Sequence, residues 1–241
     1  FGDEGADSAV ETFAVTGALP LPTQIDSDSL SVMGGLGYAQ LTFATRSDTA
    51  KVQVFRVSDG DTLDVDTDAI GAPIAVSGSS TVMTVDGDAT RSNLLASSDM
   101  TGWTEAGGWS ITSGVATHTP GSASTLTQSL SLTAGDSYRG SITVSGRTAG
   151  SVVVQLAGTT DVPTAAIDAD GIAYFDLAAV TGNDRIEIVA TSDFDGDVTA
   201  ALAFRESATS APQGIFDYYV APITADNIGR APVGPVTATI V

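Results

Sequence analysis

The apolar residues of this chain fall in strand-length segments separated by short turn-forming ones, and this pattern limits the fold more than any other feature. The clearest segment is KVQVFRV, where Val52 and Val54 alternate with Lys51 and Gln53, as on a strand with one buried and one wet face. No stretch keeps a helical period with capping signals. Val, Thr, Ser and Gly are abundant whereas Glu, Lys and Met are sparse, which favours strands and turns. The sequence therefore predicts an all-β fold.

The charge of the chain narrows the choice of partners. Its 241 residues carry a net charge of −20, from 29 acidic and 9 basic residues. Such a surface repels nucleic acid and anionic membranes, so we expect neither of these as a partner. It suits a saline medium, and we therefore favour a marine or saline source. There is no cysteine for a disulfide and no apolar run of the roughly 20 residues that span a bilayer. Because the chain begins at Phe1 without a methionine, we expect a fragment or a trimmed product.

The two ends of the chain contain complementary sets of strands. From Ala18 to Thr90 we count about five short strands, with an acidic, turn-rich segment at residues 58–71. Two partners are missing from this set, and they follow Glu206. The segment 207–214 is a linker by composition, and residues 215–241 then give a strand, a turn at Asp226–Asn227 and a last strand. Residues 1–17 are acidic and small, which is typical of a linker or of an arm that docks on a partner subunit.

The closing segment YYVAPITADNIGRAPVGPVTATIV resembles the last hairpin of a fibronectin type III domain. That family has an aromatic-rich strand, a short Asn/Gly turn and a Gly-Pro-Val step into its final strand. These roles fall on Tyr219, Ala221, Asn227, Gly229, Gly234, Pro235 and Val236. The resemblance implies that residues 18–92 and 207–241 form one discontinuous fibronectin III-like β-sandwich. Asn93 and Glu206 should then lie close together, since insertions are tolerated where strand ends are near each other.

The inserted segment, residues 93–206, has strand motifs of its own. It opens on NLLASSDMTGWT, continues through GGWSITSG and LTAGDSYRGSITVSG, and closes after the turn DFDG. Alternating segments at residues 138–144 and 152–156 flank GRTAG, which predicts a hairpin turn between them. This order resembles carbohydrate-binding modules of the galactose-binding jelly-roll type. The resemblance is carried by Asn93, Leu94, Leu95, Gly102, Trp103, Trp109, Gln128, Leu132, Thr133, Gly135, Tyr138, Asp193, Phe194 and Gly196.

A jelly roll combined with a fibronectin III-like sandwich is similar to the layout of tail-tip and tail-fibre proteins of tailed bacteriophages and gene transfer agents. The resemblance implies a non-enzymatic structural and adhesive protein of a virion tail, located in the extracellular virion. Its expected partners are other tail subunits and host cell-surface polysaccharide, and a homo-oligomer such as a trimer is compatible with tail symmetry. The alternative is a bacterial extracellular adhesin, or a carbohydrate-binding accessory module of a surface enzyme.

Four rings are candidates for binding carbohydrate. Sugar-binding modules stack a pyranose on an aromatic ring and fix its hydroxyls with polar side chains. Trp103, Trp109, Tyr138 and His118 are the rings of the insert that fit this chemistry. The alternative is that the two tryptophans and Tyr138 are core residues of the jelly roll. His118 lies between two threonines in VATHTPG and is predicted to point outward, as an ordinary surface or rim residue.

Two aspartate-rich segments are candidates for calcium, a hard cation that takes several oxygen ligands. Asp193, Asp195 and Asp197 have the spacing that opens a calcium-binding loop, although the later bidentate glutamate is missing. The second segment is rich in aspartates at positions 59, 61, 64, 66 and 68. The alternative for both segments is a solvated acidic loop. A structural calcium ion is the one cofactor that the sequence suggests.

The sequence offers little support for catalysis. One histidine excludes most histidine-based metal sites, and the absence of cysteine excludes a thiol nucleophile. No GxSxG elbow and no phosphate-binding loop is present. Paired carboxylates could serve a glycosidase, but aspartates occur throughout this chain. We therefore expect no enzyme.

Overall fold

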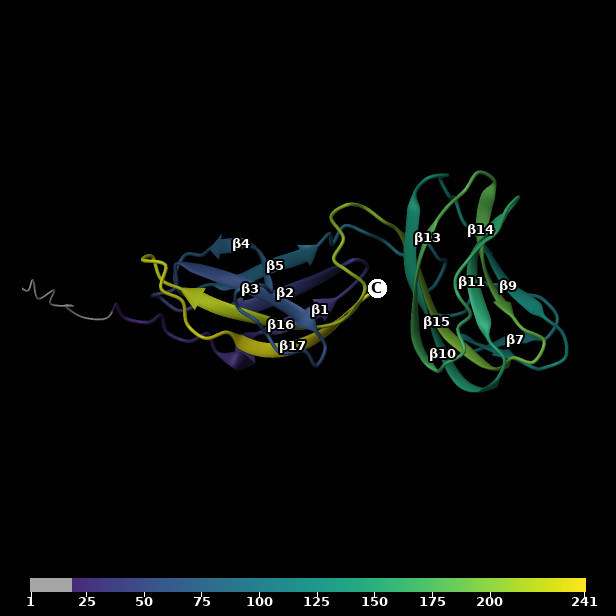
Figure 1. Cartoon of the computed structure of the whole chain (residues 1–241), viewed down its shortest axis with the longest axis horizontal. Helices are drawn as coiled ribbons and strands as arrows, with labels where there is room; N and C mark the ends of the chain where they lie inside the picture. The colour runs from purple at the N-terminus through teal and green to yellow at the C-terminus, as the bar shows by residue number, and fades with distance from the viewer. Residues whose placement is uncertain (1–18) are drawn as a thin grey trace, which may run out of the picture.

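The computed structural model describes residues 19–241, and this part of the chain is all-β, as predicted. Apart from one short 3-10 helix, η1 (Ser27–Ser29), its regular elements are strands. They form two lobes joined by two chain segments (Figure 1). Within residues 19–241, no helix is both long enough and apolar enough to cross a membrane. The arm predicted for residues 1–17 lies outside the described residues.

The first lobe, which we call the host, takes strands from both sides of residues 93–206. One sheet has the order β1-β2-β5 and the other the order β17-β16-β3-β4. The five strands predicted before Thr90 are all present, and β3 pairs antiparallel with β16 although more than 150 residues separate them. The strands are β1 (Ser31–Gly34), β2 (Tyr38–Ala44), β3 (Lys51–Ser58), β4 (Ala69–Ala75), β5 (Thr81–Gly87), β16 (Gly214–Ile223) and β17 (Val233–Ile240).

The core of the host lies between these two sheets. Leu41 and Phe43 alternate with half-buried residues along β2, and they meet Val52 and Val54 of β3 in one hydrophobic cluster. Val220 of β16 joins the same cluster, so residues from both ends of the sequence are buried together.

The second lobe, which we call the guest, is formed by residues 93–206 and has two five-stranded sheets. Their strand orders are β13-β10-β15-β8-β7 and β12-β11-β14-β9-β6. The guest has its own buried cluster, which shares no residue with that of the host. The strands are β6 (Thr104–Glu105), β7 (Trp109–Thr112), β8 (Val115–His118), β9 (Ser124–Ser129), β10 (Ser137–Ala149), β11 (Val152–Gly158), β12 (Val162–Pro163), β13 (Gly171–Ala178), β14 (Asn183–Ala190) and β15 (Asp195–Arg205).

The hairpin predicted at GRTAG is wrong. Strand β10 continues through this segment to Ala149, and its partners are β13 and β15. Strand β11 belongs to the opposite sheet, where it pairs with β14 and β12. Gly146 and Gly150 do have the positive φ angles of a turn sequence, but the chain uses them to cross between sheets. Periodicity marks a strand and a change of direction, and it does not say which sheet the next strand joins.

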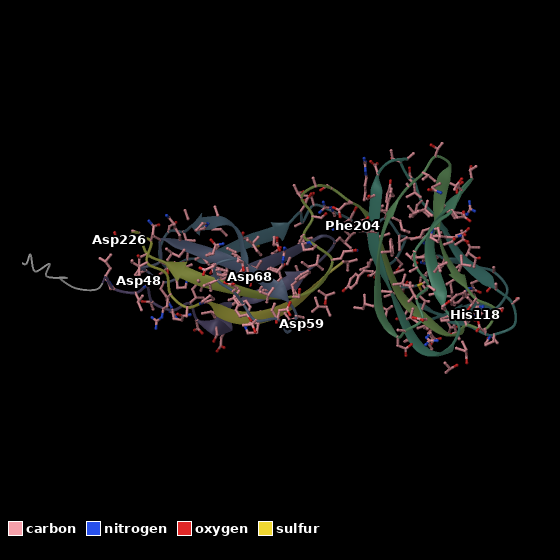
Figure 2. All side chains as sticks on the ribbon, in the orientation of Figure 1. Asp48, Asp59, Asp68, His118, Phe204 and Asp226 are labelled. Carbon is pink, nitrogen blue, oxygen red and sulfur yellow. The ribbon has the colours of Figure 1, made fainter. Side chains whose placement is uncertain are left out.

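The junction between host and guest is held by charged side chains. Asn93 starts the guest and Glu206 ends it, and the Oε1 atom of Glu206 lies 3.7 Å from the guanidinium of Arg91. Arg139 of β10 lies 2.6 Å from the other oxygen of Glu206. The Arg91 guanidinium also lies over the ring of Phe204, 5.5 Å from its centre, on the side of the guest that faces the host (Figure 2). Two cations therefore share one carboxylate where both chain segments cross.

The segment 207–213 leads from the guest back to the host and donates hydrogen bonds to main-chain oxygens of both lobes. The amide of Ala211 donates to the carbonyl oxygen of Gly37, in the β1–β2 turn of the host, at 2.8 Å. The side-chain amide of Gln213 donates to the carbonyl oxygens of Gly140 and Phe175 in the guest, at 3.1 and 3.3 Å. The guest therefore meets the host through β10 and β13, and β7, at the other end of the same sheet, lies away from the host (Figure 1).

Candidate functional site

His118 is buried, and the prediction that it points outward is wrong. Only 1% of its surface is exposed, and its neighbour Ala116 is also buried, so the even-numbered residues of β8 face the core. The Nδ1 atom lies 2.6 Å from the carbonyl oxygen of Phe194, which can only accept, so Nδ1 carries the proton. The Nε2 atom, 3.0 Å from Oγ of Ser124, then accepts a hydrogen bond from that hydroxyl. The alternation of His118 with threonines predicts a solvent-exposed position, because the sequence gives no sign of its two buried partners, Phe194 and Ser124.

His118 and Ser124 are residue types that can act as a base and a nucleophile, but the resemblance to a catalytic pair ends there. Ser124 is 8% exposed, and the second ring nitrogen of His118 bonds a main-chain carbonyl where a catalytic arrangement would place a carboxylate. A substrate could not reach either side chain without opening the guest core. The pair therefore fixes the packing of β8 and β9 in this structure.

Trp109, His118 and Phe194 form a cluster of rings inside the guest. The Trp109 ring centre lies 4.9 Å from that of His118 and 5.9 Å from that of Phe194. Trp109 is 6% exposed, so its faces are occupied by protein. Edge-to-face contacts of this kind add to the stabilisation that burial supplies. The structure thus gives Trp109 and His118 the packing role and no open face for a pyranose.

Tyr138 and Trp103 are also buried, and they differ in what lies next to them. The hydroxyl of Tyr138 accepts a hydrogen bond from the amide of Thr133 at 2.9 Å, which ties β10 to the turn before it. The face of Tyr138 is packed in the guest core. Trp103 belongs to the same core but also lines a hollow on the guest surface. Trp103 therefore lies next to a space that a ligand could fill.

The hollow beside Trp103 has a volume of about 530 Å³ and lies at the edge formed by β6 and β7. That volume falls within the range of small-molecule sites. Its wall contains two carboxylates, Asp99 and Glu105, that the sequence reasoning did not single out. The complete lining is Asp99, Thr101, Gly102, Trp103, Glu105, Ile111, Ser113 and Gly114.

The two carboxylates of this hollow are held in place by local hydrogen bonds. Oδ1 of Asp99 accepts from the amide of Thr101 at 2.8 Å, and Oε1 of Glu105 accepts from the amide of Ile111 at 2.8 Å. Hydrogen bonds from Ser97 and then Thr101 lower the pKa of Asp99, so this carboxylate stays ionised in mildly acidic solution. Each carboxylate has a second oxygen, and together with the hydroxyls of Thr101 and Ser113 these atoms suit a polyhydroxylated ligand.

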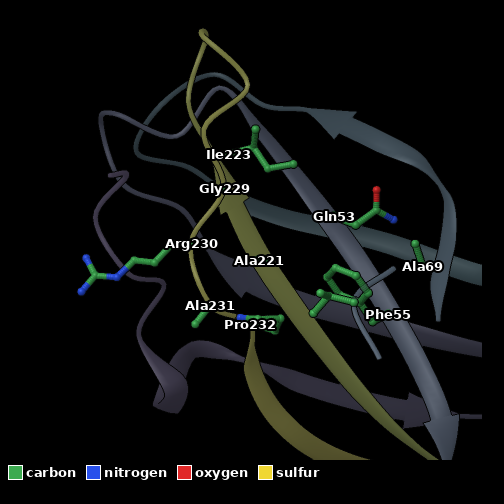
Figure 3. Close-up of a pocket in the computed structure, with 10 residues that line it drawn as sticks. Gln53, Phe55, Ala69, Ala221, Ile223, Gly229, Arg230, Ala231 and Pro232 are labelled. Carbon is green, nitrogen blue, oxygen red and sulfur yellow. The ribbon is translucent and has the colours of Figure 1, made fainter. Parts of the chain in front are cut away.

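A second hollow, of about 560 Å³, lies on the host (Figure 3). Phe55, Val65, Ala221, Ile223 and Pro232 are among the residues that line it. The one amide in it, that of Gln53, already donates to the carbonyl oxygens of Val54 and Ile70. This groove is apolar and offers few groups for sugar hydroxyls.

The aspartates predicted to bind calcium do not gather into one cluster within residues 19–241. Asp195 and Asp197 lie two residues apart on β15 and accept hydrogen bonds from Thr148 and Thr117 respectively. Asp193 is exposed in the turn before them. In the second segment, Asp64 and Asp68 accept from main-chain amides of their own loop. Across residues 19–241, no three acidic or histidine side chains come together closely enough to hold a metal ion. Calcium takes six to eight oxygen ligands, and these carboxylates alone do not supply such a set, so the calcium site stays a prediction.

This geometry predicts that removing calcium leaves the fold unchanged. A bound ion present at 100 times its Kd would stabilise the protein by about 2.7 kcal/mol, which a melting curve detects easily. We expect the thermal unfolding profile in a chelator to superimpose on the profile in millimolar calcium. A drop of several degrees in the chelator would contradict the structure and restore Asp193, Asp195 and Asp197 as candidate ligands.

Comparison with known proteins does not assign a function to this site. The chain matches no protein-family model, and no curated protein is significantly similar to it.

Proposed function

We propose that this chain is a non-enzymatic structural and adhesive component of a phage-like tail, in which the host is a scaffold and the guest binds cell-surface glycan. The main support for glycan binding is the hollow lined by Asp99, Trp103 and Glu105. It combines a largely buried tryptophan, two fixed carboxylates and hydroxyl groups around a space of about 530 Å³. These are the groups that recognise sugars through hydroxyl hydrogen bonds and apolar ring contacts.

The placement of the hollow supports a display role. It lies at the β6–β7 edge of the guest, whereas the contacts with the host are made by β10 and β13. The binding edge therefore stays free when the host is fixed in a larger assembly. A single shallow site binds weakly, and many copies in one particle raise the avidity without any new contact per copy.

The topology of the host supports the fibronectin III-like part of the proposal. Its strands are ordered β1-β2-β5 in one sheet and β17-β16-β3-β4 in the other, and the closing pair β16–β17 contains the Tyr219 and Pro235 motifs. An antiparallel sandwich of this kind occurs in many extracellular and surface proteins. Fold alone does not determine function, so the glycan site is the part that requires a test.

A glycan array provides that test. We expect the full chain to bind a subset of bacterial surface polysaccharides. The double substitution Asp99→Asn and Glu105→Gln should weaken binding by roughly tenfold or more, because each removes a charge-assisted hydrogen bond worth about 1.5–3 kcal/mol. Both substitutions keep the size of the side chain and an oxygen acceptor, so the local turns should survive.

Asp168→Asn is the matched control, since Asp168 is an exposed aspartate of the guest outside the hollow. It changes the net charge as Asp99→Asn does and should leave binding unaltered. Equal binding by wild type and the double variant would place the site elsewhere. Binding to no glycan would leave the guest as a spacer in a purely structural protein.

A further inference from the structure

One edge strand of the host lacks the features that normally prevent pairing with another chain. Natural sheets protect their edges with short strands, prolines, bulges, charges or covering segments. Strand β1 has only four residues, and β4 contains Pro73 and a break in its register with β3. Strand β17 contains Pro235, and β1 packs beside it. Strand β5 has seven residues, TVMTVDG, with no proline and no basic residue.

The free edge of β5 has unpaired main-chain groups. Its residues pair with β2 from Tyr38↔Gly87 to Ala44↔Thr81. On the other side, the main-chain groups of residues 82–86 make no hydrogen bond within the described part of the chain. The one charged side chain of the strand, Asp86, turns inward and contacts Arg56 and Tyr218. It therefore does not shield the edge.

The outer face beside this edge is uncharged and exposes apolar side chains among uncharged polar ones. Met83 is 68% exposed and Val85 41%, and Met33 at the far side of the same sheet is 56% exposed. The pairing register places Met33, Gln40 and Val85 in one row across the three strands. The neighbouring row contains Ser31, Thr42 and Met83, so neither row holds a charge.

The charge of the whole chain identifies the partner that such a surface fits. A molecule with a net charge of −20 repels its own copies wherever acidic groups meet. An uncharged strip is the place where two copies can approach with least repulsion. A basic partner would be attracted by the acidic surfaces elsewhere and would gain nothing here from charge. A second copy of this chain is therefore the occupant that the strip favours.

We propose that β5 pairs antiparallel with β5 of a second copy, which joins the two three-stranded sheets into one continuous sheet. Thr84 is the middle residue of the strand, so a symmetric pair places it opposite Thr84 of the second copy. Met83 then lies opposite Val85 of the second copy on the outer face, and these apolar pairs stabilise the junction. Because the same strand serves both copies, the interface is isologous and closes at a dimer. This inference does not depend on the glycan site.

Sedimentation velocity over a concentration series tests the association. We expect the full chain to shift from monomer to dimer as its concentration rises, and the double substitution Met83→Lys and Val85→Lys to stay monomeric where wild type is dimeric. The lysines would meet across the junction and repel each other. Met33→Lys is the control, because it puts a lysine on the same face but away from the edge, and it should dimerise like wild type. Circular dichroism checks that each variant is folded.

A single cysteine tests the register. The chain contains no cysteine, so Thr84→Cys introduces the only thiol. Directly opposed residues in an antiparallel pair have Cα atoms about 4.5–5.5 Å apart, which a disulfide can span. We expect Thr84→Cys to form a covalent dimer on mild oxidation and Thr42→Cys, one strand further in, to form none. A wild type that is monomeric at all concentrations would overturn the proposal. So would a Met33→Lys variant that loses dimerisation equally, or cross-linking at Thr42→Cys alone.

Discussion

Replacing Asp86 with alanine is expected to lower the unfolding temperature of the host by on the order of 10–20 °C, from a loss of about 3–5 kcal/mol. Asp86 lies between the two sheets of the host, where its Oδ2 atom accepts a hydrogen bond from the hydroxyl of Tyr218 at 2.8 Å and pairs with Arg56. Alanine would leave a largely buried guanidinium and a buried phenol without their acceptor. Burial, and then the Asp86 carboxylate, raise the pKa of Tyr218 far above its usual range, so the phenol remains a donor at all ordinary pH values.

Calorimetry can attribute this loss to the host because the two lobes have separate cores. The matched control is Asp28→Ala, which removes an exposed aspartate from the same lobe. We expect the control to stay within about 0.5 kcal/mol of wild type, as most surface substitutions do. If Asp86→Ala cost no more than Asp28→Ala, the buried network would not hold the two sheets of the host together.

The second large effect is expected from Phe194→Ala in the guest. The side chain of Phe194 is completely buried against Trp109 and His118, and removing a phenylalanine from such a core costs about 3–5 kcal/mol. The hydrogen bond from His118 to the carbonyl of residue 194 also depends on this packing. The guest should therefore unfold at a much lower temperature or denaturant concentration, while the host is unaffected.

Tryptophan fluorescence measures this loss selectively, since both tryptophans of the chain lie in the guest. The control is Val180→Ala, which shortens an exposed apolar residue of the same lobe and should have a small effect. A loss below about 1 kcal/mol for Phe194→Ala would mean that the three rings do not pack as the structure has them.

The strands could be predicted from the sequence because alternation marks the buried residues of β2. Along β3 the expected wet face is wrong in part, since Gln53 is buried together with Phe55. Leu41, Phe43, Val52 and Val54 all occupy the core positions that their spacing indicates. Sheet membership could not be predicted in the same way. The GRTAG segment contains the glycines of a turn, yet it carries the chain from one sheet of the guest to the other.

The candidate site was less accessible to sequence reasoning. Ring type drew attention to Trp109, Tyr138 and His118, which are buried by contacts that come from distant strands, such as the carbonyl of Phe194 on His118. Trp103 borders a hollow, and its neighbours Asp99 and Glu105 look like ordinary acidic residues in an acidic chain. The available signal was their position on either side of Trp103, in the SDMTGWTEAGG segment.

Calorimetric titration tests the proposal that the guest binds glycan at the hollow of Asp99, Trp103 and Glu105. The ligand is the oligosaccharide that gives the strongest signal on the array, and it is titrated into wild type, the Asp99→Asn and Glu105→Gln double variant, and Asp168→Asn. We expect one site per chain in wild type and in Asp168→Asn, with the affinity lost or reduced by roughly tenfold or more in the double variant. The same affinity in all three proteins would contradict it.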